Sequence, residues 1–221
     1  MLKFVFFIIF LSASLILGGC GGEAPTNVKN NADSGKRETR NLSGFKKIKA
    51  GDSVTLEITV QKDFSVTVET GDKELQYVTT QISGDTLNIT TDKDKISSVN
   101  KAVLKISMPE LVELEVSGIT DATVSDAKSE SLKLQANNMS KIKISGETKN
   151  LKANGNGKSL ILAENLKTEN AEVEVNGASQ ATVAPTNELN AKANGASLVT
   201  YIGEPKKIKK TTTGEGAVQK N

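Results

Sequence analysis

Ala193-Asn194-Gly195-Ala196-Ser197 is the last of five related copies of one short pattern in this chain. The earlier copies are Val116-Ser117-Gly118-Ile119-Thr120, Ala136-Asn137-Asn138-Met139-Ser140, Ala153-Asn154-Gly155-Asn156-Gly157 and Val175-Asn176-Gly177-Ala178-Ser179. Their spacing of about 17 to 22 residues lies at the low end of the range that indicates a solenoid. Asn and Gly tolerate a positive φ at least cost, so each copy predicts a sharp corner in the backbone.

Apolar and polar residues alternate on both sides of each corner. Leu132, Leu134 and Ala136 precede the second corner, and Ile142 and Ile144 follow it. A period of two is typical of a strand with one buried face, so each repeat predicts two strands joined by a bend. After the third corner, the same alternation assigns Leu160 and Leu162 to the buried face.

Asn-Gly between alternating runs is also a hairpin signal. Independent hairpins would not need a nearly fixed interval, whereas stacked coils would, so the sequence favours an all-β parallel solenoid. In such a stack the corner asparagines are expected to form an internal ladder of side-chain amides, made by Asn137, Asn154, Asn176 and Asn194. Outward-facing Glu174 is expected to pair with Lys152 and Lys192 on the neighbouring rungs.

The N-terminus has the pattern of an export signal. Lys3 precedes an apolar run from Phe4 to Leu17, which at about 14 residues is too short to span a bilayer as a helix. Leu17-Gly18-Gly19-Cys20 resembles a bacterial lipobox, so residues 1–19 are expected to be a lipoprotein signal peptide and Cys20 the lipidated residue. In a bacterium with two membranes, Gly21 after the cysteine favours the outer membrane.

The stretch that follows is rich in Gly, Asn, Ser, Thr and charge, and residues 20–43 are therefore expected to form a flexible tether. Residues 44–218 are expected to form the β-solenoid domain, with hairpins in its strand-rich N-terminal part. Lys206 to Lys210, after Pro205, are expected to end strand pairing.

Composition excludes several kinds of function. Cys20 is the only cysteine and the chain has no histidine, which argues against an internal disulfide and a Cys/His metal site, and no cofactor is expected. The formal net charge is only +2 and no dense basic run occurs, which argues against binding to nucleic acid.

Several motifs in order give the chain a resemblance to a known family. They are Gly44-Phe45-Lys46-Lys47-Ile48, Met108-Pro109-Glu110-Leu111, the repeated corners, Gly203-Glu204-Pro205 and Gly214-Glu215-Gly216. Together they resemble the putative auto-transporter adhesin, head GIN domain family of bacterial envelope proteins. The resemblance implies a single-stranded, right-handed parallel β-helix and a role in adhesion, without a catalytic or binding residue set.

Two functions remain open from the sequence. A lipid-anchored, non-catalytic module for adhesion or for binding envelope polymers is expected, with the membrane, glycans and envelope or host surface proteins as partners. The alternative is a carbohydrate-active β-helix enzyme, a polysaccharide lyase or hydrolase, which needs clustered carboxylates. Acids such as Asp121, Glu147, Glu164 and Glu174 do not recur at one repeat position, and few aromatic residues are available as sugar platforms.

Overall fold

The computed structural model describes residues 36–92, 94–96 and 101–221. The signal peptide predicted for residues 1–19 and the lipidation predicted at Cys20 lie outside these residues. The described part is built from strands and one 3₁₀ turn, η1 (Leu75–Tyr77), with no α-helix. Its strands are β1 (Lys36–Arg40), β2 (Lys47–Ala50), β3 (Val54–Val60), β4 (Ser65–Thr70), β5 (Val78–Ser83), β6 (Thr86–Thr91), β7 (Ala102–Met108), β8 (Glu113–Val116), β9 (Asp121–Asn138), β10 (Lys141–Gly157), β11 (Leu160–Gly177), β12 (Gln180–Gly195), β13 (Leu198–Tyr201), β14 (Lys207–Gly214) and β15 (Ala217–Lys220).

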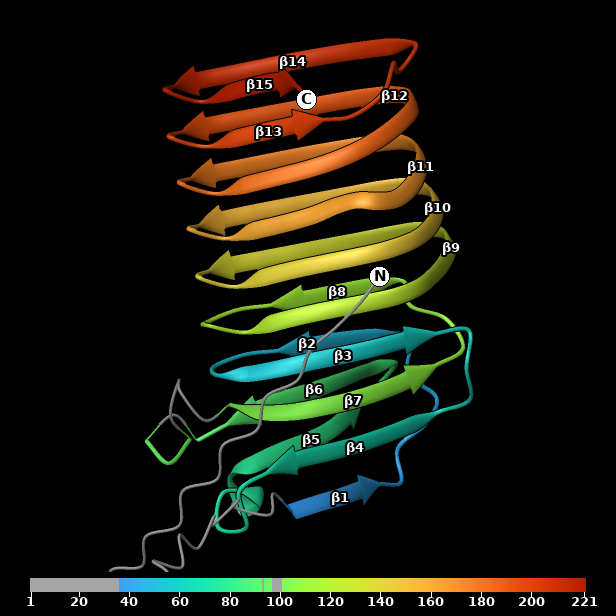
Figure 1. Cartoon of the computed structure of the whole chain (residues 1–221), viewed down its shortest axis with the longest axis vertical. Helices are drawn as coiled ribbons and strands as arrows, with labels where there is room; N and C mark the ends of the chain where they lie inside the picture. The colour runs from blue at the N-terminus through green and yellow to red at the C-terminus, as the bar shows by residue number, and fades with distance from the viewer. Residues whose placement is uncertain (1–35, 93, 97–100) are drawn as a thin grey trace, which may run out of the picture. The chain divides into compact units, whose positions relative to one another are not determined.

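The long strands β9 to β12 are coils of a solenoid rather than flat strands. Each runs along one face, turns through a wide bend and returns along the opposite face (Figure 1). Its first half pairs in parallel with the first halves of its neighbours, and its second half with their second halves. A tight corner then leads to the next coil. The predicted all-β parallel solenoid is therefore confirmed, with about five turns; its right-handed sense stays a prediction.

The N-terminal part of the solenoid is not stacked in chain order. β2 pairs with both β6 and β8, and β3 pairs with both β7 and β9. The turn formed by β2 and β3 therefore lies between the turn of β6 and β7 and the turn of β8 and β9 (Figure 1). Nothing in the local sequence pattern signals this order.

Antiparallel strands close the N-terminal end, in agreement with the hairpins expected there. β5 and β6 form a hairpin around Gly84 and Asp85, and β4 pairs antiparallel with β7. β1 adds to β4 in the same sense. The predicted tether is therefore wrong for its last part, because Lys36–Arg40 is an ordered strand with Arg37 ion-paired to Glu69. Both faces of β1 are polar and mostly exposed, so its sequence has no alternation of apolar and polar residues that would predict a strand.

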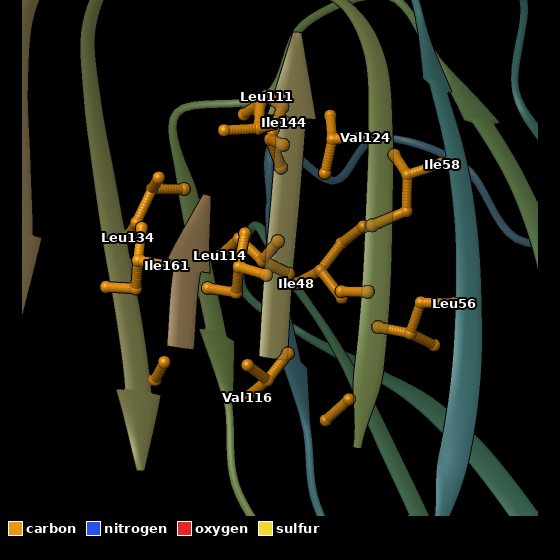
Figure 2. Packing of buried hydrophobic residues seen from close by; sticks show 14 of the residues in the cluster. Ile48, Leu56, Ile58, Leu111, Leu114, Val116, Val124, Leu134, Ile144 and Ile161 are labelled. Carbon is orange, nitrogen blue, oxygen red and sulfur yellow. The ribbon is translucent and has the colours of Figure 1, made fainter. Parts of the chain in front are cut away.

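The core fills the space between the two faces. Ile48, Leu114 and Leu134 from one face pack toward Leu56 and Val124 from the other (Figure 2). Each of these five side chains is at most 1% exposed. Complete burial of one such side chain contributes about 1.5–3 kcal/mol, so the inward rows supply the main stabilisation.

A further turn follows the last copy of the repeat. β14 pairs in parallel with β12, and β15 pairs in parallel with β13. The corner between them includes Gly214, whose φ of 67° matches the left-handed geometry of the earlier corners. The expectation that Lys206 to Lys210 end strand pairing is wrong, because exposed lysines on an outer rung leave its backbone free to pair.

Candidate functional site

The tight corners carry a continuous ladder of side-chain amides. Asn156 donates through Nδ2 to Oδ1 of Asn137 at 2.9 Å, Asn176 donates to Asn156 at 3.0 Å, and Asn194 donates to Asn176 at 2.8 Å. Thr213 extends the row by donating its hydroxyl to Oδ1 of Asn194 at 2.7 Å. The ladder thus ties five successive coils together at one edge.

Two parts of the predicted ladder are wrong. Asn156, not Asn154, is the second member of the ladder, because Asn154 aligns with Gln135 and Glu174. The ladder also lies on the surface rather than inside, with Asn156 exposed. The inner side of the corners is lined instead by buried hydroxyls, those of Thr120, Ser140, Ser159, Ser179 and Ser197.

The third repeat is thus aligned two residues away from its predicted position, and this difference also changes the ion pairs and buried residues predicted beside the corner. Lys152 pairs with Glu172 at 3.2 Å rather than with Glu174, while the expected pair of Glu174 and Lys192 is present at 3.7 Å. After the corner, Ile161 and Ala163 are buried, and the residues predicted there, Leu160 and Leu162, lie on the outer face and are only half-buried.

The wide bend, opposite the corners, carries a second amide ladder that the sequence interpretation missed. Asn170 donates to Oδ1 of Asn150 at 3.0 Å, and Asn187 donates to Oδ1 of Asn170 at 2.8 Å. Beneath them, the buried hydroxyl of Thr148 donates to the Ser129 carbonyl at 3.0 Å. The detectable signal was a recurring Thr-x-Asn, present at 148–150 and 168–170.

Two rows of alternating charge flank this ladder on the bend. Lys128 pairs with Glu147 at 3.0 Å, and Lys149 pairs with Glu130 at 3.0 Å. The hydrogen bond from Lys128, reinforced by its charge, lowers the pKa of Glu147. The hydrogen bond to Glu130, reinforced by its charge, raises the pKa of Lys149. Both shifts favour the charged forms of Glu147 and Lys149.

Two grooves accompany the bend. The smaller, of about 530 Å³, is lined by Asn150, Asn170 and the paired Lys152 and Glu172. The larger, of about 900 Å³, extends from the coil of β9 to the segment 202–204. With rungs about 4.8 Å apart, the larger groove runs for about 19 Å along the stack, which is long enough for an extended polymer.

The enzyme alternative finds little support in these grooves. Of the carboxylates lining the larger groove, Glu130, Glu147 and Glu204 are ion-paired with lysines. Of the described residues that line either groove, none is aromatic. Among the described residues, no group of three or more potential ligands is placed to hold a metal ion, and none of the helical structure is long and apolar enough to cross a membrane.

The described residues thus define a parallel β-solenoid that displays polar rows and grooves along its axis. The chain belongs to the family described as putative auto-transporter adhesin, head GIN domain, whose model matches residues 44–205. Membership gives it an adhesion-like role at the cell surface or envelope.

Solved structures share the fold at low sequence identity. A putative adhesin from Bacteroides fragilis matches with a TM-score of 0.66 and 18% identity, over 85% of this chain and 97% of that one. A putative lipid binding protein from Parabacteroides distasonis matches with a TM-score of 0.55 and 18% identity, over 86% and 98%. No curated protein matches this chain significantly.

Proposed function

We propose that the chain is a lipid-anchored, non-catalytic module of the bacterial envelope that adheres through the polar bend of its solenoid. Lipid on Cys20 would attach the N-terminus to a membrane, with the outer membrane as its location in a bacterium with two membranes. The solenoid would then present its bend to glycans, envelope polymers or surface proteins, and nucleic acid is not among the proposed partners.

The observation that carries this proposal is the regular presentation of polar groups at rung spacing. Amides of Asn150, Asn170 and Asn187 recur along one line, and charged pairs recur beside them. Each amide keeps donor and acceptor capacity beyond the bond to its neighbour. A partner with its own repeat can therefore make many weak contacts at once, and such contacts add through effective concentration.

The ion pairs of the carboxylates in the larger groove also support the proposal. A pair of catalytic carboxylates needs distinct environments that separate their pKa values. Here Lys128 lowers the pKa of Glu147, and Glu130 is ion-paired with Lys149. The pattern suits binding better than proton transfer.

The test is surface accessibility on intact cells. A peptide tag inserted near Asn31 is followed by protease treatment, with Cys20→Ser as the matched control. Removal of the wild-type tag by protease, together with loss of Cys20→Ser from the membrane fraction, is the expected result. Protection of the tag until the outer membrane is broken would refute surface adhesion, and membrane retention of Cys20→Ser would refute the lipid anchor.

A further inference from the structure

The larger groove exists because one coil is shorter than the coil beneath it. On β11, three residues, 164–166, separate Ala163 from Lys167, whereas their partners on β12, Val183 and Ala184, are adjacent. β12 regains one residue farther on, because Pro185 and Glu188 are three apart whereas their partners Thr168 and Asn170 are two apart, so it passes through the bend with two fewer residues. Ala184, the buried Pro185 and Ile202 line the resulting hollow above the bulge of β11.

The bulge places an unusual acceptor at this hollow. Glu164 lines the groove, and its Oε2 is shielded from solvent and accepts no hydrogen bond within the described residues. A buried polar atom without a partner is costly, and more so when the group is charged. Because Glu164 itself is only partly buried and borders the groove, a turn of its side chain would present this carboxylate to a donor from outside the chain.

The other residues that line the groove indicate which kind of hydrogen-bond donor would bind to Glu164. Five glutamates and three lysines line the groove, and two of the lysines, Lys128 and Lys149, are engaged by Glu147 and Glu130, so the lining is acidic overall. Apolar contact is available from Ala184 and Ile202, while the described lining includes no aromatic ring that could stack against a sugar. These features favour a cationic group on an extended chain with small side chains.

We propose that this groove binds an extended polypeptide segment through a primary ammonium or guanidinium group that donates to Glu164. The assignment rests on the proposed adhesive function and names its partner as a lysine- or arginine-bearing peptide on a surface protein. The segment lies along the stack axis over Pro185 and Ile202, and its cation pairs with the carboxylate of Glu164, whose side chain turns into the groove.

The experiment measures binding of a fluorescent peptide to the purified full chain in detergent, by anisotropy at low and high salt. The probe is a short peptide of glycine, serine and threonine with one central lysine. Its matched control carries Nε-acetyl-lysine instead. We expect the lysine peptide to bind, the acetylated peptide to lose about tenfold or more in affinity, and added salt to weaken binding.

Three variants locate the contact. Glu164→Gln is expected to reduce affinity about tenfold, because the acceptor loses its charge. Ala184→Arg places a guanidinium of the chain itself in the groove and is expected to compete with the peptide. Glu57→Gln, an exposed glutamate on β3 outside the groove, is expected to leave binding unchanged. Thermal unfolding of each variant shows that the fold is retained.

Several results would overturn the inference. Equal losses in Glu57→Gln and Glu164→Gln would show general attraction between charges, and equal binding of both peptides would exclude the ammonium contact. Glu164-dependent binding of a glucosamine tetramer without peptide binding would assign the groove to amino sugars instead. Absence of any binding by a folded wild-type chain would remove the peptide site, while the accessibility test on cells would still decide the adhesive role separately.

Discussion

Removal of one amide from the corner ladder should measure how much the ladder contributes to stability. Asn156→Ala deletes the donor to Asn137 at 2.9 Å and the acceptor for Asn176 at 3.0 Å. A hydrogen bond contributes about 0.5–1.5 kcal/mol net. Because Asn156 is exposed and water can replace part of the loss, we expect the free energy of unfolding to fall by about 1–2 kcal/mol.

The control lies two residues away in the same coil. Within the described residues, the Asn154 side chain makes no hydrogen bond of this kind, so Asn154→Ala should change the free energy of unfolding by less than about 0.5 kcal/mol. Urea denaturation followed by circular dichroism compares the midpoints at unchanged slope. Because stacked repeats can lose cooperativity, amide hydrogen exchange in β10 and β11 provides a local second reading. Equal effects of the two substitutions would refute the assignment of the ladder to Asn156.

Three further perturbations test the corners, the core and the charged bend. Gly177→Ala should destabilise the fold by about 2–3 kcal/mol in thermal melts, since φ is 79° and a Cβ would approach a backbone oxygen of the coil below at 2.9 Å. Gly84→Ala, with open space around the added Cβ, should destabilise it by only about 1–2 kcal/mol. Leu134→Ala, at a fully buried position, should lower the free energy of unfolding by about 2–5 kcal/mol in urea. The hydrogen bond from Lys128 lowers the pKa of Glu147, so the stabilisation by this ion pair is present above the ordinary pKa of 4.5 and is lost as the pH falls below that value. The melting temperatures of wild type and Glu147→Gln should therefore converge in acid and in 1 M salt. A constant difference between them would refute the ion-pair explanation.

The fold class could be predicted because alternation and the repeated corner report local geometry directly. The ladder position could not, because Ala153-Asn154-Gly155-Asn156-Gly157 contains two Asn-Gly pairs two residues apart. A shift of two preserves which side chains face inward, so periodicity cannot choose between them. The structure chooses Asn156, with Gly155 at the inward position that Ala136 and Val175 occupy on neighbouring coils.

Three other features could not be predicted from local sequence patterns, because they depend on how distant strands pair. Leu160, Ile161, Leu162 and Ala163 are four apolar residues in a row, so alternation gives no parity there, and only the register with β10 shows that Ile161 points inward. The insertion of the β2 and β3 turn between two later turns depends on pairing between distant strands. The acceptor at Glu164 depends on a difference in length between two coils, which appears only when their registers are compared.

Specific recognition by this solenoid should be concentrated where stacking is imperfect. Where coils match residue for residue, each outward row repeats every rung and its charges find partners on the next rung, as Lys128 does with Glu147. The charged groups of such a surface already pair with one another, so they offer only weak contacts to a partner. A coil of different length interrupts the rows and opens a hollow. It also leaves a hydrogen-bond acceptor without a donor, as happens between β11 and β12 among the described residues. Insertions and deletions at the bend, rather than substitutions along the faces, are therefore the changes expected to alter what the domain binds.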